Sequence, residues 1–263
     1  MLRMNNKFSK AELAAKRVLE ECGLDDPSEY SVGDIILGRG AYYEEKPLQG
    51  KEGEIVSVAG RSFISINSNI RFESKKRFAA AHELGHYELH QGLANIAFDT
   101  EYELLNWYKA GPQETEANEF AAEFLMPSDA FYNECKAKRF SPQVIDHLAA
   151  RFRVSKTAAI LQFVKRGNHP VCIVYCQNNK MLWWKTSQDF QYFLEFNYNQ
   201  APSTGSVAYE IFTGGQMDSE KQQVIWKSDW FRMGKDEFKD PEFYEYCLHV
   251  KSLNYTISVI WER

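Results

Sequence analysis

The sequence predicts an α+β protein with two domains, residues 1–167 and 168–263. In the first part, apolar residues recur at helical spacing and are interrupted by one pair of β-type segments. Gly167 and Pro170 then mark a boundary, and the residues after it form runs of β-branched and aromatic side chains that contain most of the tryptophans. We therefore expect helices with a small β-sheet first, followed by a mainly β, aromatic-rich domain.

The first domain is expected to contain a series of helices and one hairpin. Ser9 is a cap signal for a helix over residues 8–22, and residues 23–38 break into turns. Residues 53–70 carry β-branched residues on both sides of a turn at Gly60, the pattern of a hairpin. Further helices are expected over residues 75–89, 114–125, 141–152 and 155–166.

Composition and charge argue against several classes of protein. The chain has 263 residues, of which 44% are hydrophobic, so it can bury packed cores without disulfide support. Its 36 acidic residues outnumber its 31 Lys and Arg residues, and the net charge of -5 disfavours nonspecific attraction to nucleic acid or anionic membranes. No apolar stretch approaches the roughly 18 residues of a membrane span, and the N-terminal residues lack the apolar core of a signal peptide. We expect a cytoplasmic protein with no membrane partner.

The cysteines indicate a reducing compartment. There are five, an odd number, at scattered positions, which argues against a disulfide framework. Cys172 and Cys176 lie in the β-type run VCIVYC, where residues four apart share a face of the strand but lie about 13 Å apart. Because two ligands so far apart cannot reach one metal ion, we expect buried thiols.

The segment AAHELGHYELH, residues 80–90, carries the clearest chemical signal. On a helix, His82 and His86 project from one face, where two imidazoles can bind one metal ion. Glu83 lies one position round the helix, so its carboxylate can approach a metal-bound water and act as a general base without being a ligand. Zinc suits a set of nitrogen and carboxylate ligands. A helix that merely contains histidines is the alternative that this motif alone leaves open.

A second helix, ETEANEFAAEFLMP, offers a third ligand. A catalytic zinc site uses three protein ligands and keeps one position open for water. Glu114, Glu116 and Glu119 are the candidates. Glu114 and Asn118 share a helix face, so Glu114 could bind zinc while Asn118 hydrogen-bonds a metal ligand. Glu116 and Glu123 are expected nearer the solvent side.

His90 lies four residues after His86, on much the same helix face. The helix carries it about 6 Å further along the axis. We therefore expect His90 to join a hydrogen-bond network or to lie at the surface, rather than to bind the same metal ion.

The segment AAHELGHYELH, followed by ETEANEFAAEFLMP and SPQVIDHLAARFRVS, resembles the ImmA/IrrE family of zinc metallopeptidases over roughly residues 8–167. The pair of motifs is more specific than HELGH, which many zincins share. The resemblance implies a zincin-like domain, in which a helix-turn-helix-like segment follows the helices and the small β-sheet. It also implies one Zn²⁺ per chain, held by the two motif histidines and Glu114 in a gluzincin-like site, with Glu116 as the fallback. Glu83 is then the catalytic base.

The resemblance also suggests a substrate-binding strand, SFISINSNI. In zincins of this layout, an edge strand beside the active-site helix pairs with the extended backbone of the substrate. We therefore expect Ser65, Ile66 and Asn67 to bind substrate from an edge strand. A plain strand of the sheet is the alternative.

Two functions follow. The resemblance implies a cytoplasmic, zinc-dependent regulatory endopeptidase that cleaves a partner protein, a helix-turn-helix transcriptional repressor, in a stress or mobile-element response. Some family members carry a sensor-like domain after the peptidase, so residues 168–263 could be regulatory. The alternative is a non-proteolytic, zinc-containing regulator that acts through ligand, DNA or protein binding. The helices over residues 141–166 lack a dense basic stripe, so direct DNA binding is the weaker alternative.

Overall fold

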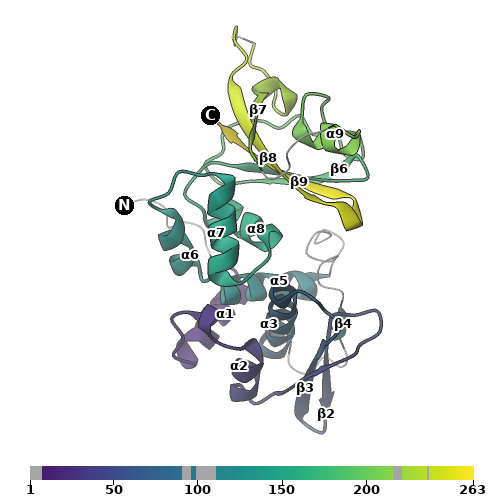
Figure 1. Cartoon of the computed structure of the whole chain (residues 1–263). Helices are drawn as coiled ribbons and strands as arrows, with labels where there is room; N and C mark the ends of the chain where they lie inside the picture. Colours follow the sequence, from purple (N-terminus) through teal and green to yellow (C-terminus); the bar gives the residue numbers. More distant parts are fainter. Residues whose placement is uncertain (1–7, 91–95, 99–110, 216–220, 236) are drawn as a thin grey trace. The chain divides into compact units, whose positions relative to one another are not determined.

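The computed structural model describes residues 8–90, 96–98, 111–215, 221–235 and 237–263, which form helices and two β-sheets (Figure 1). The chain divides into two compact units. Unit 1 comprises the described residues up to Phe131 together with residues 149–155, and unit 2 comprises residues 132–148 and the described residues from Lys156 onward. The predicted α+β class is therefore confirmed. A domain boundary after residue 167 stays a prediction.

Unit 1 combines helices with a four-stranded sheet, in the strand order β1-β3-β2-β4. Strand β1 runs parallel to β3, and the other neighbouring pairs are antiparallel. Helix α3 packs against helix α5 and against strands β2 and β3 (Figure 1). The elements are α1 (Lys10–Glu21), the 3-10 helix η1 (Pro27–Glu29), α2 (Val32–Gly38), β1 (Tyr42–Lys46), β2 (Gly53–Val58), β3 (Arg61–Asn67), α3 (Glu73–Leu89), β4 (Ile96–Phe98) and α5 (Pro112–Leu125).

Unit 2 is built on a five-stranded antiparallel sheet, in the order β6-β5-β9-β8-β7. The mainly β C-terminal part is therefore confirmed. Helices α6 (Ser128–Cys135) and α7 (Pro142–Phe152) contribute residues to both units. The remaining elements are α8 (Lys156–Arg166), β5 (Cys172–Gln177), β6 (Lys180–Thr186), α9 (Val207–Phe212), β7 (Gln223–Trp226), the 3-10 helix η2 (Lys227–Asp229), β8 (Glu242–Val250), the 3-10 helix η3 (Lys251–Leu253) and β9 (Tyr255–Glu262).

The predicted hairpin and the helices that were expected from periodicity are confirmed by β2, β3, α1, α3, α5, α7 and α8. Helix α1 begins after Ser9, which forms a capping box with Glu12, so two backbone donors at the helix start are satisfied. The hairpin turns at Ala59 and Gly60, whose φ angles of 50° and 76° match the twist of the strands. Cys172 and Cys176 are buried free thiols, as expected. Between the two motif helices, residues 91–95 and 99–110 lie outside the described residues.

The prediction that residues 23–38 contain only turns is wrong. Residues from Val32 to Gly38 form α2, which Ser31 caps by accepting a hydrogen bond from the Asp34 amide. The helix has seven residues, too few for a clear apolar period, and Gly33 weakens its helix propensity. Packing explains the glycine, because a Cβ at Gly33 would lie 2.6 Å from the ring of Tyr43.

The prediction that Ser65, Ile66 and Asn67 lie on an edge strand is also wrong. They belong to β3, which pairs with β1 on one side and β2 on the other. The backbone groups of an interior strand are already hydrogen-bonded on both sides, so β3 cannot accept a substrate strand. The cause of the error is β1, whose sequence YYEEK lacks an apolar alternation that would predict a strand. Among the described strands of this sheet, β1 and β4 are the edges.

Within the described residues, no helix has the length and apolar character that a membrane span requires.

Candidate metal centre

Three buried side chains converge where α3 packs against α5. The Nε2 atoms of His82 and His86 lie 3.0 Å apart, and the Glu114 carboxylate lies 3.2 Å from the first and 3.4 Å from the second. Among the described residues, this is the one group of three His, Cys, Asp or Glu side chains whose ligand atoms lie close together, all within 4.8 Å of one another. The structure therefore brings together the three residues that the sequence singled out as ligands.

Small residues allow this convergence. A Cβ at Gly85 would lie 3.1 Å from the ring of Phe120 and 3.2 Å from the Cα of Ala117, so the glycine lets α5 approach α3 closely. Ala117 is itself fully buried. Because Glu114 lies about one turn before Ala117 on α5, the same close approach brings its carboxylate within reach of the two histidines.

Hydrogen bonds on the far side of each imidazole set its direction. His82 Nδ1 lies 3.0 Å from Asn118 Oδ1, and His86 Nδ1 lies 3.0 Å from His90 Nδ1. A neutral imidazole carries one N–H, so a ring that donates from Nδ1 has a lone pair on Nε2. Asn118 thus lies where the sequence predicts it, beside a histidine of the group.

The three inward-facing atoms fit a metal ion. Two nitrogen lone pairs that face each other and a carboxylate repel one another unless a cation lies between them. A shared proton can bridge two of these atoms, whereas a metal ion can bind all three. Two imidazoles and one carboxylate are also a ligand set that is used for catalytic zinc.

The surrounding charges favour the forms that bind metal. Burial alone would raise the pKa of Glu114, but the nearby imidazoles of His82 and His86 outweigh it and hold that pKa below its usual value. Burial lowers the pKa of His86, against the opposing influence of the nearby Glu114 carboxylate. An ionised carboxylate and a neutral imidazole are the species that coordinate a metal ion.

Glu83 is fully buried on α3 and does not belong to the three-residue group. Its carboxylate packs against Gly53, the first residue of β2, where an added Cβ would lie only 2.6 Å from Glu83 Oε1. Gly53 therefore leaves the space that the carboxylate occupies. Sequence reasoning missed this residue, although a glycine within a β-type pattern often marks a close approach of the backbone.

The other carboxylates on α5 have different partners. Glu116 Oε2 lies 2.8 Å from His90 Nε2, which directs it away from the three-residue group. The expectation that Glu123 lies near solvent is wrong, because it is buried and accepts hydrogen bonds from the amide and hydroxyl of Ser128 at the start of α6. A carboxylate there satisfies a free backbone donor of the helix start.

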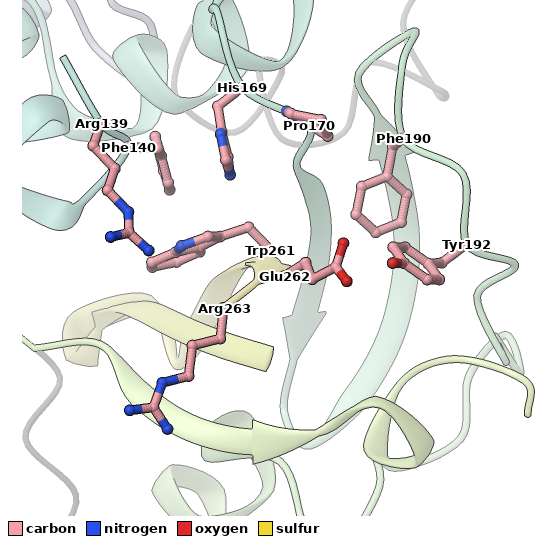
Figure 2. A pocket seen from close by; sticks show the side chains of 9 residues that line it. All are labelled: Arg139, Phe140, His169, Pro170, Phe190, Tyr192, Trp261, Glu262 and Arg263. Atoms are coloured by element: carbon pink, nitrogen blue, oxygen red, sulfur yellow. The ribbon is translucent and has the colours of Figure 1, made fainter. Parts of the chain in front are cut away.

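Unit 2 contains a cavity of about 240 Å³, which Figure 2 shows from close by. Its walls are mainly aromatic, and the Phe140 and Trp261 rings meet edge to face with centroids 4.7 Å apart. Arg263, which also lines the cavity, pairs with Glu242. No comparable group of metal ligands occurs in this cavity among the described residues, so the candidate metal centre belongs to unit 1.

Comparison with known proteins agrees with this placement. Residues 39–162 match the Peptidase_M78 family, described as an IrrE N-terminal-like domain. This segment belongs to the Peptidase_M78 family. It contains α3 and α5, the two helices that carry the three converging residues, and it confirms the resemblance to ImmA/IrrE proteins over the matched residues. The Peptidase_M78 assignment indicates a metallopeptidase with a protein substrate.

A solved structure has the same fold as this chain. It is a Mycobacterium tuberculosis transcriptional regulator, with a TM-score of 0.65 and 12% sequence identity. The match covers 98% of this chain and 78% of that one. At so low an identity, the likeness shows the fold alone. No curated protein matches this chain in sequence.

Proposed function

We propose that the chain is a zinc-dependent regulatory endopeptidase, in which His82, His86 and Glu114 bind the zinc and Glu83 is the general base. The observation that carries this proposal is the convergence of two imidazole Nε2 atoms and one carboxylate at the α3–α5 contact. The Peptidase_M78 match over the same helices supports it independently.

The number of ligands favours a catalytic site over a structural one. Structural zinc sites are usually closed by four protein ligands, whereas catalytic sites use three and leave a position for water. The group contains three ligands, and the described residues add no fourth.

The proposed reaction is the hydrolysis of a peptide bond. Bound zinc would polarise the scissile carbonyl and lower the pKa of a bound water to about 7. Glu83 takes a proton from the attacking water, whose oxygen forms the new bond to the carbonyl carbon. When the C–N bond breaks, Glu83 passes that proton to the leaving amine. Asn118 and His90 lie beside the Nδ1 atoms of His82 and His86, so the Nε2 atoms of both rings stay directed at the metal position.

We extend the proposal to the substrate, a helix-turn-helix transcriptional repressor that is cleaved in the cytoplasm during a stress or mobile-element response. The support is the ImmA/IrrE resemblance. The solved structure with the same fold is named a transcriptional regulator, a name that concerns that protein and fits a role in transcription control for this one.

Metal analysis of purified protein tests the site. We expect one zinc per chain by elemental analysis of the wild type, and a loss of zinc in Glu114→Ala. Glu119→Ala, on the same helix but outside the group, is the matched control and should keep its zinc. A wild type that neither carries zinc nor takes it up at micromolar concentration would overturn the proposal.

Cleavage of a repressor tests the reaction. The chain is incubated with helix-turn-helix repressors from the same genome, and the products are identified by mass spectrometry. Glu83→Gln should keep its zinc and lose about 10²- to 10⁴-fold in cleavage rate, the range for a general base. Full activity of Glu83→Gln would remove Glu83 from the mechanism. Zinc binding without cleavage of any repressor would favour the non-proteolytic regulator.

A further inference from the structure

We infer that His90 and Glu116 are positioning residues for the metal centre, which hold His86 in the tautomer that presents Nε2 to the metal. Neither residue would touch the metal ion. The inference rests on the proposed metal site and adds to it a path from a buried ligand to a carboxylate near the surface.

The contacts form a continuous chain. His86 Nδ1 lies 3.0 Å from His90 Nδ1, and His90 Nε2 lies 2.8 Å from Glu116 Oε2. The two imidazole rings lie 5.1 Å apart between centroids. The His90 side chain is only 7% exposed, whereas that of Glu116 is 38% exposed, so the chain of contacts leads from the interior towards solvent.

The Glu116 carboxylate sets the donor and acceptor roles in this series of hydrogen bonds. A carboxylate accepts hydrogen bonds, so Nε2 of His90 must donate to Glu116. In neutral His90 the hydrogen is then on Nε2, and Nδ1 can only accept. His86 must therefore donate from Nδ1, which leaves a lone pair on its Nε2. That Nε2 is the atom that lies 3.4 Å from the Glu114 carboxylate and 3.0 Å from His82 Nε2.

The two motif histidines obtain the same orientation in different ways. His82 has an acceptor directly on α5, because Asn118 Oδ1 lies beside its Nδ1. The partner of His86 at this position is another imidazole, which can accept or donate depending on its tautomer. Glu116 removes this ambiguity by accepting a hydrogen bond from His90 Nε2. An outer carboxylate that fixes a histidine ligand through hydrogen bonds typically contributes about 10- to 100-fold in metal affinity.

Zinc affinity of the full chain, measured by competition with a chromophoric chelator, tests the inference. We expect His90→Leu and Glu116→Ala to weaken zinc binding by about 10- to 100-fold. His90→Gln should recover much of the loss, because its amide oxygen can accept from His86 while its amide nitrogen donates to Glu116. His147→Leu is the matched control, since His147 Nε2 also lies 2.8 Å from a glutamate, Glu134. Its zinc affinity should be unchanged.

Histidine ¹⁵N–¹H spectra give a second readout that does not depend on metal. The wild type should show His86 protonated at Nδ1 and His90 at Nε2, and Glu116→Ala should lose this defined pattern while the chain stays folded. If the wild type binds zinc and all three site variants bind it equally well, the inference is wrong and the metal site stands. If the wild type shows this tautomer pattern but binds no zinc, the proposed function fails, and with it the positioning role.

Discussion

Glu114 in unit 1 and Glu245 in unit 2 are both buried carboxylates, yet their surroundings are opposite. Glu114 faces two imidazole nitrogens whose own hydrogens are directed outward, and it completes a set of three converging acceptors. Glu245 accepts hydrogen bonds from four donors: the amides of Val207 (2.9 Å) and Ala208 (3.2 Å), Trp230 Nε1 (2.9 Å) and Ser258 Oγ (2.6 Å). The first arrangement is completed by a cation, and the second is already complete.

The difference shows that burial by itself does not identify a functional carboxylate. Burial raises the pKa of Glu245 above its usual value, even though four hydrogen bonds oppose that rise. For Glu114 the influence of the two nearby imidazoles prevails over burial, and the pKa falls. What separates a metal centre from a structural network is therefore the kind of atom that faces the carboxylate.

The largest expected effect on folding is at Glu245. Glu245→Gln places an amide NH₂ against N–H and O–H donors, so we expect a loss of about 2–4 kcal/mol in the free energy of unfolding. Urea denaturation measures it. Glu242→Gln on the same strand is the control, since Glu242 pairs with Arg263 at the surface, and it should change stability by less than about 0.5 kcal/mol. If both changes lowered the free energy of unfolding equally, Glu245 would not differ from a surface carboxylate, and the contrast with Glu114 would not hold.

Zinc should stabilise the folded protein through Glu114 and not through Glu245. At a free zinc concentration of 100 times Kd, binding to the folded state adds about 2.7 kcal/mol to the free energy of unfolding. We expect this gain in the wild type and in Glu245→Gln, and its absence in Glu114→Ala. Thermal unfolding with zinc and with a chelator checks it. A zinc-dependent gain that persists in Glu114→Ala would place the metal elsewhere.

A third buried carboxylate, Glu83, is held by close packing against a backbone. Gly53→Ala would push a methyl group into the carboxylate, and we expect about a 10- to 100-fold loss of cleavage rate with zinc content unchanged. The measurement is the cleavage rate of a susceptible repressor at saturating zinc. Gly38→Ala is the control, because a Cβ there meets no atom within 4 Å. Unaltered cleavage by Gly53→Ala would show that the glycine does not position the base.

The smallest expected effect concerns a partly exposed carboxylate. Burial alone would raise the pKa of Asp26, but hydrogen bonds from Arg151 and Ser28 hold it below its usual value. Because the folded-state pKa is lowered, the stabilisation is present above about pH 4 and is lost as the pH falls through the lowered pKa. Asp26→Asn should remove about 0.5–1 kcal/mol at pH 6 and flatten the pH dependence below 4, as urea denaturation would show. Asp129→Asn, at an 81% exposed side chain, should keep the wild-type profile.

Periodicity and motif spacing were sufficient to predict the two helices of the metal centre. They left the choice among Glu114, Glu116 and Glu119 open, because the sequence pattern of neither helix predicts how α5 is rotated against α3. Contact at Gly85 decides that rotation and directs Glu114 to the histidines and Glu116 to His90. The edge-strand error at Ser65 has a similar origin, since strand order depends on pairing with a distant segment.

The sequence by itself determined the α+β class, the HELGH helix with its two imidazoles on one face, and the buried free thiols of Cys172 and Cys176. Each follows from local spacing or composition, which are properties of the sequence and do not depend on the fold. Only the tertiary structure decided which glutamate joins the histidines, which glycine makes room for Glu83, and how Glu116 reaches His86 through His90. These depend on contacts between segments far apart in sequence, whose geometry is set by side-chain packing between elements rather than by the pattern within any one of them.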